Sequence, residues 1–493
     1  MEKNKPERKS AGVRKSASVE CEPRTAFADV AVIGAGASGL AAAVLAAGRG
    51  RSVVIVEGNE KAGKKLYATG NGRCNFTNRD CTPESFNRPD DSFVESVLSR
   101  FGTEETLRFF ESQGMMARLE EGGRYYPYSG QASAVVKTLE RAAKKAGCRF
   151  LFSERAVKTE FSEDMMPGSG RSEAGFRILT ESGRKLYCRR LILACGGRAG
   201  LKTGSTGDGY GFAKSFGHTL EPPRPALTAA ESEAEFLREL KGVRARGNVT
   251  LYERAELPEV LRKRRYDEEA LKPENRGLRK IAAETGEIQF TATGISGICV
   301  FDLTRRMDGI RPPATKKKRE KSGSRQEKAA AGKEYVIACD FVPEKSEEEL
   351  YRMISGFSRH ADGETSGGER YAAHGLADIL SGIVNERLAE VIAKLSEGDA
   401  RRAAGMLRCF EVPISHTRGW EDAQVTCGGV RREEICPGTL ESRLQPGLFF
   451  CGEVIDVDGR CGGFNLQWAW SSGAAAGCAA GGETDVKLNE EER

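Results

Sequence analysis

The stretch that decides the fold is Gly34-Ala-Gly-Ala-Ser-Gly39, which stands between the apolar run Val30-Ala-Val-Ile33 and an alanine-rich run from Leu40 to Ala47. A second apolar run, Ser52-Val-Val-Ile-Val56, follows and leads directly to Glu57. This order predicts a strand, a glycine turn, a helix and a second strand, which is the βαβ unit of a parallel sheet. The sequence therefore indicates an α/β fold that opens on a Rossmann-type unit.

Each glycine of the turn has a distinct purpose in such a unit. Gly34 permits the tight turn, Gly36 lets a pyrophosphate approach the backbone, and Gly39 lets the helix pack on the strand. Glu57 ends the second strand, where an acceptor for ribose hydroxyls is expected. The pattern predicts a bound dinucleotide, either a nicotinamide or a flavin; a glycine turn in a nucleotide-free α/β fold is the alternative.

The amino-acid composition restricts the class of protein to which this chain can belong. Hydrophobic residues make up 39% and charged residues 30% of the chain, a balance typical of soluble globular proteins. The first 26 residues lack the apolar core of a secretory signal, and no long unbroken apolar run follows them. The 14 cysteines include no C-x-x-C pair, so we expect reduced thiols, a cytoplasmic location and no metal site.

The net charge of +5 comes from one segment. Nine Lys or Arg and two Glu lie between Arg311 and Lys333, without aromatic residues among them. Nucleic-acid surfaces spread basic residues along a face and combine them with aromatics. We therefore expect a solvated basic loop at 311–333 rather than a polyanion site, and neither a nucleic-acid nor a membrane partner.

The segment after Glu57 favours a flavin over a nicotinamide. A simple nicotinamide dehydrogenase continues into a second half-fold, whereas this chain continues into the polar, glycine-punctuated loop Lys64-Lys-Leu-Tyr-Ala-Thr-Gly-Asn-Gly-Arg-Cys-Asn-Phe-Thr-Asn78. Such a loop can bring amide donors against a flavin's ribityl chain and ring edge. Near the C-terminus, Gly462-Gly463 precedes a predicted helix, whose N–H groups would stabilise negative charge on a reduced flavin.

The remaining periodicity predicts how the chain is divided. Helical spacing runs over 91–113, 131–146 and 345–410, and strands are expected at 175–188, 248–252, 286–290, 297–301 and 335–339. The fold class is an α/β, discontinuous Rossmann-type FAD-binding domain with an inserted antiparallel β domain and a small helical subdomain. We expect a disordered lead-in at 1–26, the first part of the FAD-binding domain at 27–205, the β domain at 206–344, the helical subdomain at 345–412, the second part of the FAD-binding domain at 413–482 and a tail at 483–493.

Several of these motifs together resemble a known family. The segments that carry the resemblance are GAGASG at 34–39, KKLYATGNGRCNFTN at 64–78, the glycine-rich segment at 191–218, GEIQFTATGISG at 286–297, QVTCGGV at 424–430, and the block from Phe449 to Gly477. They resemble the bacterial flavoproteins called aminoacetone-oxidase-like, a family that includes a bile-acid-inducible 3-dehydro-bile-acid reductase. The resemblance covers 28–482; the charged material around 258–280 and the loop at 311–333 depart from it.

The resemblance implies an FAD site that can be placed residue by residue. It assigns the pyrophosphate to Gly34, Gly36, Ser38 and Gly39, the adenosine ribose to Glu57, and the ribityl-to-ring region to Arg73, Cys74 and Asn75. Lys65 is also expected to bind the cofactor. Val157 would line the adenine pocket, and Ala194 and Gly196 would close over the nucleotide half. Near the C-terminus, the resemblance assigns Gly452, Glu453 and Asp456 to the pyrophosphate and ribityl chain, and Gly463, Phe464, Asn465 and Leu466 to the pyrimidine end of the ring.

The sequence gives only a few candidates for catalytic side chains. Among the four histidines, His416 is a candidate, because it lies where the flavin domain is expected to resume. Tyr126 could place a phenol over the flavin, although core packing explains it equally well. The cysteines in glycine-rich segments are explained by their small size.

The resemblance implies hydride transfer from NAD(P)H, through the flavin, to an activated C=C bond of an apolar enone. The expected acceptors are 3-oxo-Δ4 or Δ4,6 bile-acid intermediates, free or as CoA thioesters. Only one G-x-G-x-x-G is present, so NAD(P)H would use the same flavin face as the acceptor in a two-step exchange. Two alternatives stay open: an amine or aminoketone oxidase that uses dioxygen, and a flavin-bearing binding protein or RNA-modifying accessory protein. The oligomeric state is left undetermined.

Overall fold

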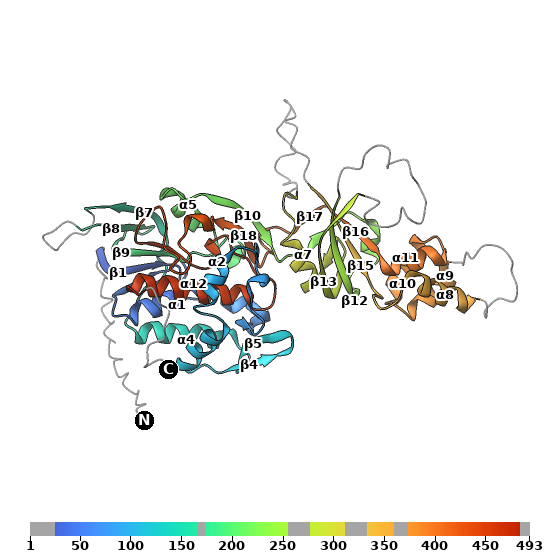
Figure 1. Cartoon of the computed structure of the whole chain (residues 1–493), viewed down its shortest axis with the longest axis horizontal. Helices are drawn as coiled ribbons and strands as arrows, with labels where there is room; N and C mark the ends of the chain where they lie inside the picture. Colours follow the sequence, from blue (N-terminus) through green and yellow to red (C-terminus); the bar gives the residue numbers. More distant parts are fainter. Residues whose placement is uncertain (1–24, 165–172, 255–276, 311–332, 359–372, 484–493) are drawn as a thin grey trace, which may run out of the picture.

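The computed structural model describes residues 25–164, 173–254, 277–310, 333–358 and 373–483. These residues form two lobes that follow one another along the long axis of the molecule (Figure 1). The first lobe contains both ends of the described chain, and the second contains the middle of the sequence. The expected lead-in at 1–26 and the basic loop at 311–333 fall almost entirely outside the described residues.

The first lobe is built on a largely parallel sheet in the order β6-β2-β1-β9-β8-β7, in which β19 also pairs with β9. Strands β1, β2, β6, β9 and β19 run parallel, whereas β7 and β8 are antiparallel additions. Because β19 follows the second lobe in sequence, the C-terminal segment completes the N-terminal sheet, and the discontinuous Rossmann-type fold is confirmed. The strands are β1 (Thr25–Ile33), β2 (Val53–Val56), β6 (Arg149–Leu151), β7 (Ala156–Ser162), β8 (Gly175–Thr180), β9 (Lys185–Leu193) and β19 (Leu448–Phe450).

Two buried helices pack closely within this lobe. Helix α1 (Ala37–Ala47) and helix α12 (Phe464–Gly481) are rich in alanine and glycine and lie against each other (Figure 1). A Cβ at Gly473 would lie 2.5 Å from the carbonyl oxygen of Ser38, so only glycine permits this approach. The lobe also contains α2 (Ser92–Leu98), α3 (Thr103–Ser112), α4 (Ala132–Lys145), α5 (Asp208–Ser215) and a small sheet of β3 (Thr77–Asn78), β4 (Ala117–Glu120) and β5 (Arg124–Pro127).

The chain passes between the lobes along a two-stranded ribbon. Strand β10 (Leu220–Ala226) leads toward the second lobe and β18 (Val425–Val430) returns, and the two are antiparallel partners. The crossover points therefore lie near 227 and 424 rather than at the expected boundaries 205/206 and 412/413. The pairing of β10 with β18, which are about 200 residues apart in sequence, determines where the chain crosses between the lobes. A local sequence pattern cannot predict such a pairing.

The second lobe has an antiparallel sheet in the order β16-β15-β12-β13-β14-β11-β17. Its strands are β11 (Ala230–Glu231), β12 (Arg244–Arg254), β13 (Leu278–Thr291), β14 (Gly294–Ser296), β15 (Glu334–Asp340), β16 (Phe410–Ile414) and β17 (His416–Thr417). Four helices lie at the far end of this lobe in Figure 1: α8 (Glu347–Ser358), α9 (Ala373–Ser381), α10 (Glu386–Leu395) and α11 (Ala400–Arg408). The expected β insertion and helical part are both present.

One predicted strand is wrong. The run 297–301 begins helix α7 (Ile298–Thr304), which packs on β13. Gly297 has φ +122° and a Cβ there would lie 2.2 Å from the carbonyl oxygen of Glu287, so the chain turns sharply at this glycine. The buried residues Cys299, Val300 and Leu303 then recur at helical spacing. A run of five residues is too short to reveal the helical period.

Two longer predictions are divided in the structure. The expected strand at 175–188 is two strands, β8 and β9, joined by a turn, and the expected helix at 91–113 is α2 and α3, with Gly102 as the N-cap of α3.

Among the residues that the structure describes, no helix combines the length and apolar character needed to span a bilayer.

Candidate active site

A cavity of about 970 Å³ opens where the carboxyl ends of β1, β2 and β9 meet. Ile33, Val56 and Leu193 lie next to one another in the sheet register, so the loops that follow them converge at this edge. Ligands of open α/β sheets bind at such an edge. Residues of the first turn, of the C-terminal block and of α7 all line the cavity.

The end of the cavity beside the first turn suits a pyrophosphate and a ribose. Gly36 has an extended backbone, and a Cβ there would meet no heavy atom within 4 Å, so its missing side chain leaves cavity space next to the start of α1. The Glu57 carboxylate lies beside this turn, where it accepts hydrogen bonds from the amides of Ala35 and Asn59, both at 2.8 Å. The turn and the carboxylate thus have the arrangement that a dinucleotide requires.

The N-terminal and C-terminal segments meet across the middle of the cavity. Lys65 Nζ lies 2.6 Å from Glu453 Oε2, and Glu453 Oε1 accepts a hydrogen bond from the amide of Thr426 at 2.6 Å. On the opposite side, a Cβ at Gly34 would lie 2.4 Å from the carbonyl oxygen of Ala194. These contacts join loops from the N-terminal part, the middle and the C-terminal part of the chain around one cavity.

The far end of the cavity fits the ring of a flavin. Gly463, with φ +99°, is the N-cap of α12, so the first amides of this helix lie at the cavity. Asn465 holds the preceding loop, since its side chain accepts from the Gly459 amide and donates to the Gly459 carbonyl, each at 2.8 Å. The buried Oδ1 of Asn75 has no hydrogen-bond partner in the described protein, so an acceptor oxygen here is left for a ligand.

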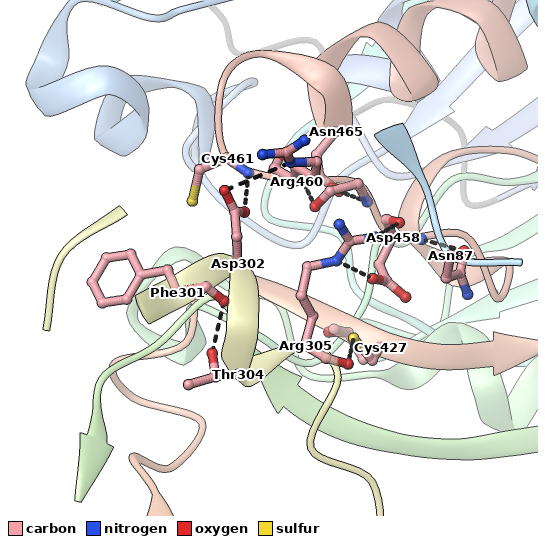
Figure 2. Close-up of polar contacts among 12 residues, drawn as sticks. Asn87, Phe301, Asp302, Thr304, Arg305, Cys427, Asp458, Arg460, Cys461 and Asn465 are labelled. Carbon is pink, nitrogen blue, oxygen red and sulfur yellow. Dashed lines mark hydrogen bonds and ion pairs between the residues drawn. The ribbon is translucent and has the colours of Figure 1, made fainter. Parts of the chain in front are cut away.

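Helix α7 of the second lobe forms the wall opposite the first-lobe loops. Ile298 and Phe301 line the cavity, and Ile298 keeps 49% of its surface exposed. Figure 2 shows how α7 contacts the loop before α12: Asp302 Oδ1 accepts from the Cys461 amide at 2.7 Å, and Arg305 Nε lies 2.9 Å from Asp458 Oδ2. Burial raises the pKa of Asp302 to about 6, although the hydrogen bond from the Cys461 amide acts against this rise.

Most of the residues expected at the cofactor lie around this cavity. The expected residues that line it are Gly34, Gly36, Ser38, Glu57, Lys65, Arg73, Asn75, Ala194, Gly196, Gly452, Glu453, Gly463, Asn465 and Leu466, together with Tyr126. Their individual contacts with the cofactor stay predictions. The cluster includes residues from both ends of the chain, as expected.

Three expected cofactor residues lie just behind the lining. Gly39 packs against the turn, where a Cβ would lie 2.0 Å from the carbonyl oxygen of Gly34. Cys74 is fully buried, and burial raises the pKa of its thiol to about 12, so it is a neutral packing group. Phe464 is packed against the core of the first lobe.

The structure does not bring three other candidates to the cavity lining. Val157 is exposed on β7, and the Asp456 carboxylate is buried against the side-chain amide of Asn87 at 3.2 Å. His416 lies on β17 in the second lobe, with Nδ1 3.0 Å from the hydroxyl of Ser415. Strand pairing holds His416 in the second sheet, whereas the sequence suggested that the flavin domain had already resumed.

Sequence reasoning missed the groups that face the flavin end of the cavity. Arg124, Arg460, Ile298 and Phe301 line it and were not among the candidates. Arg460 stands within the glycine-rich block and could have been noticed there. No local signal marks Arg124 or the α7 residues, because strand pairing and lobe packing bring them to the cavity.

Comparison with known proteins agrees with this arrangement. The model of the HI0933-like protein Rossmann domain matches residues 28–479. The chain is 34% identical to the 3-dehydro-bile acid delta(4,6)-reductase of Clostridium scindens, over 92% of this chain and 98% of that protein. It is also 28% identical to the ribosomal RNA dihydrouridine synthase of Haemophilus influenzae, over 91% of this chain and 97% of that protein, and 26% identical to that of Escherichia coli, over 90% and 96%.

The family resemblance drawn from the motifs is thereby confirmed, and FAD is the cofactor of this chain; the residues around the cavity fit this group. When bound, FAD supplies hydride transfer, while the protein supplies binding, orientation and electrostatics. The chain belongs to the HI0933-like family of Rossmann flavoproteins and is an FAD-dependent oxidoreductase.

Proposed function

We propose that this protein passes a hydride from NAD(P)H, through FAD, to a C=C bond conjugated with a carbonyl group in an apolar acceptor. The best candidates are 3-oxo-Δ4 or Δ4,6 intermediates of the bile-acid type, free or as CoA thioesters. The acceptor is a small molecule in this proposal, and no nucleic acid or membrane takes part.

The observation that carries the proposal is the apolar wall at the flavin end of the cavity. Ile298, Phe301, Leu227 and Val425 line this region, and Ile298 is half exposed although it is a large apolar residue. Exposed apolar surface inside a cavity favours an apolar ligand. A fused-ring skeleton has the flat apolar surface that such a wall can cover, and the relative that reduces a bile acid supports this choice.

The chain's own residues have three tasks in this reaction. The loops after β1 and β2 bind the nucleotide half, and the N-terminus of α12 places amide dipoles where negative charge develops on a reduced ring. Helix α7 holds the acceptor through its apolar side chains at the cavity. Because a single dinucleotide-binding motif is present in the sequence, NAD(P)H and the acceptor would use the same open face in turn.

A second acceptor has specific support. The two ribosomal RNA dihydrouridine synthases align over nearly the whole chain. Uracil also contains a C=C bond conjugated with a carbonyl, so the same hydride chemistry would serve a flipped-out base. An RNA substrate would need a cationic surface outside the cavity in addition to a base pocket.

Anaerobic rapid mixing tests the proposal. The purified yellow protein is first reduced with NADH or NADPH, and the rate of flavin reoxidation is then measured with a 3-oxo-Δ4 bile acid, its CoA thioester, unmodified ribosomal RNA, or aminoacetone with dioxygen as a separate arm. We expect reoxidation by the enone and a product two mass units heavier. Reoxidation by RNA alone, with dihydrouridine formed, would overturn the bile-acid acceptor in favour of the second candidate.

A further inference from the structure

We propose that Arg124 binds the carbonyl oxygen of the acceptor and stabilises the negative charge that forms on this oxygen during reduction. The inference rests on the proposed function, because it names the residue that would activate the conjugated carbonyl. Neither the sequence motifs nor the comparisons assign a role to this residue.

Arg124 lies at the flavin end of the cavity. It is the first residue of β5 and pairs with Asn78 of β3, whose side-chain amide donates a hydrogen bond to the carbonyl of Gly462 at 2.8 Å. Strand β5 therefore lies beside the loop that leads into α12. Arg124 lines the same cavity as Gly463 and Ile298.

Three arginines line this end of the cavity, and two of them already have partners. Arg73 forms two hydrogen bonds with the Glu120 carboxylate, at 2.5 and 3.1 Å, and lies over the ring of Tyr126. Arg460 Nη2 lies 2.6 Å from Glu284 Oε2. These carboxylates occupy donors that a ligand would otherwise use.

Arg124 differs from these two arginines. In the part of the chain that the structure describes, no carboxylate lies within 4.0 Å of its guanidinium and no hydrogen-bond acceptor contacts it. Its side chain is partly buried. A half-buried cation with all its donors available, beside a ligand cavity, has the properties of a group that binds an oxygen of the ligand.

The residues around Arg124 can orient a ligand that has an apolar skeleton and a carbonyl oxygen. Ile298 and Phe301 of α7 supply an apolar surface for the carbon skeleton, and Arg124 belongs to the first-lobe strand beside the loop that α7 contacts through Cys461. A ring system against α7 could thus direct its polar oxygen toward Arg124. The cavity would then separate the apolar skeleton from the oxygen that becomes charged.

The chemistry requires a donor at that oxygen. Hydride delivery to the β-carbon forms a C–H bond, and the π electrons of the C=C bond move through the α-carbon to the carbonyl oxygen, which gives an enolate. Arg124 donates N–H hydrogen bonds to this oxygen and keeps its own protons, because a guanidinium is not deprotonated in proteins. A proton from water then adds to the α-carbon and completes the reduction.

The test compares Arg124→Gln with Arg118→Gln. Arg118 is an exposed arginine of the neighbouring strand β4 that stacks on Tyr128 and does not line the cavity, so its replacement removes the same charge from the same sheet. In Arg124→Gln we expect the rate of reoxidation by a 3-oxo-Δ4 acceptor to fall about 10² to 10³-fold, as for the loss of an oxyanion donor elsewhere. FAD content should remain that of the unaltered protein, and reduction by NAD(P)H should slow far less than reoxidation, because hydride loss from a nicotinamide forms no enolate.

Three further measurements separate an electrostatic role from a structural one. A saturated 3-oxo analogue, titrated against the oxidised protein by its effect on the flavin spectrum, should bind more weakly to Arg124→Gln and unchanged to Arg118→Gln. Added guanidinium ion should restore part of the reoxidation rate in Arg124→Ala. Arg124→Lys, which keeps the charge but loses the planar donor pair, should have an intermediate rate.

The outcomes are distinguishable. Loss of FAD from Arg124→Gln, or equal slowing of the nicotinamide step, would show that Arg124 serves the cofactor and would overturn this inference while the proposed function stands. Wild-type rates in Arg124→Gln would overturn it as well. If the unaltered protein is reoxidised by no conjugated carbonyl compound, the proposed function itself fails, and this inference fails with it.

Discussion

Gly34 and Gly36 stand two residues apart in one turn but have different surroundings. Gly34 has φ +109°, and its Cβ would lie 2.4 Å from the carbonyl oxygen of Ala194, so a side chain there would strain the fold. Gly36 has φ −80°, and its Cβ would enter open cavity space. At the scale of the residue, Gly34 therefore serves the fold and Gly36 serves the cofactor.

We expect this difference to appear in two variants. Gly36→Ala should change the free energy of unfolding of the apoprotein by no more than about 0.5 kcal/mol and weaken FAD binding by about ten-fold or more, which corresponds to about 1.4 kcal/mol. Gly34→Ala should destabilise the apoprotein by more than about 1 kcal/mol. Urea unfolding of both apoproteins and titration with FAD measure the two effects; wild-type FAD affinity in Gly36→Ala would contradict the assignment.

At the scale of elements, the contact between α1 and α12 positions the pyrophosphate site. A Cβ at Gly477 would lie 2.4 Å from the carbonyl oxygen of Ala42, so a methyl group would force the helices apart. We expect Gly477→Ala to lower the free energy of unfolding by about 1 to 3 kcal/mol and to weaken FAD binding, because the N-terminus of α1 would move. Chemical unfolding with and without FAD provides the measurement.

Gly211 offers the matched control for this prediction. It is exposed in helix α5, and a Cβ there would meet no atom within 4 Å. Gly211→Ala should raise stability by up to about 1 kcal/mol, the gain in helix propensity. If Gly477→Ala proved as stable as Gly211→Ala, close packing of the two helices would not be the reason for glycine at 477.

At the scale of the whole molecule, a buried ion pair joins the two lobes. The side chains of Arg305, the C-cap residue of α7, and of Asp458, in the loop before α12, are 1% and 3% exposed, and their charged atoms lie 2.9 Å apart (Figure 2). The pair lies behind the cavity wall that both segments form. The position of α7 relative to the flavin therefore depends on it.

Replacing only one residue of the ion pair should destabilise the protein more than replacing both. Arg305→Met leaves Asp458 buried without its cation, so we expect a loss of about 3 to 5 kcal/mol and the appearance of a separate, earlier transition for the second lobe in calorimetry. The double variant Arg305→Met/Asp458→Leu should recover much of this loss. Equal losses in the single and double variants would show that the contact stabilises through packing alone.

The sequence by itself determined the flavin fold, the glycine turn at Gly34–Gly39 with Glu57 behind it, and the glycine turn before α12. These features depend on local constraints, namely turn conformations and short spacings, that can be read within a few dozen residues. The inserted β lobe with its helices was also predictable, because strand and helix periodicity are local. Most of the cofactor candidates therefore line one cavity in the structure.

Only the tertiary structure decided which residues outside the cofactor-binding motifs line the flavin end of the cavity. It made 298–304 a helix, brought Ile298 and Arg124 to the cavity, and left His416 and Val157 away from its lining. These outcomes follow from strand register and from the packing of one lobe on the other, which join residues hundreds of positions apart. A local pattern contains no information about such distant partners, so the acceptor side of the site became visible only in three dimensions.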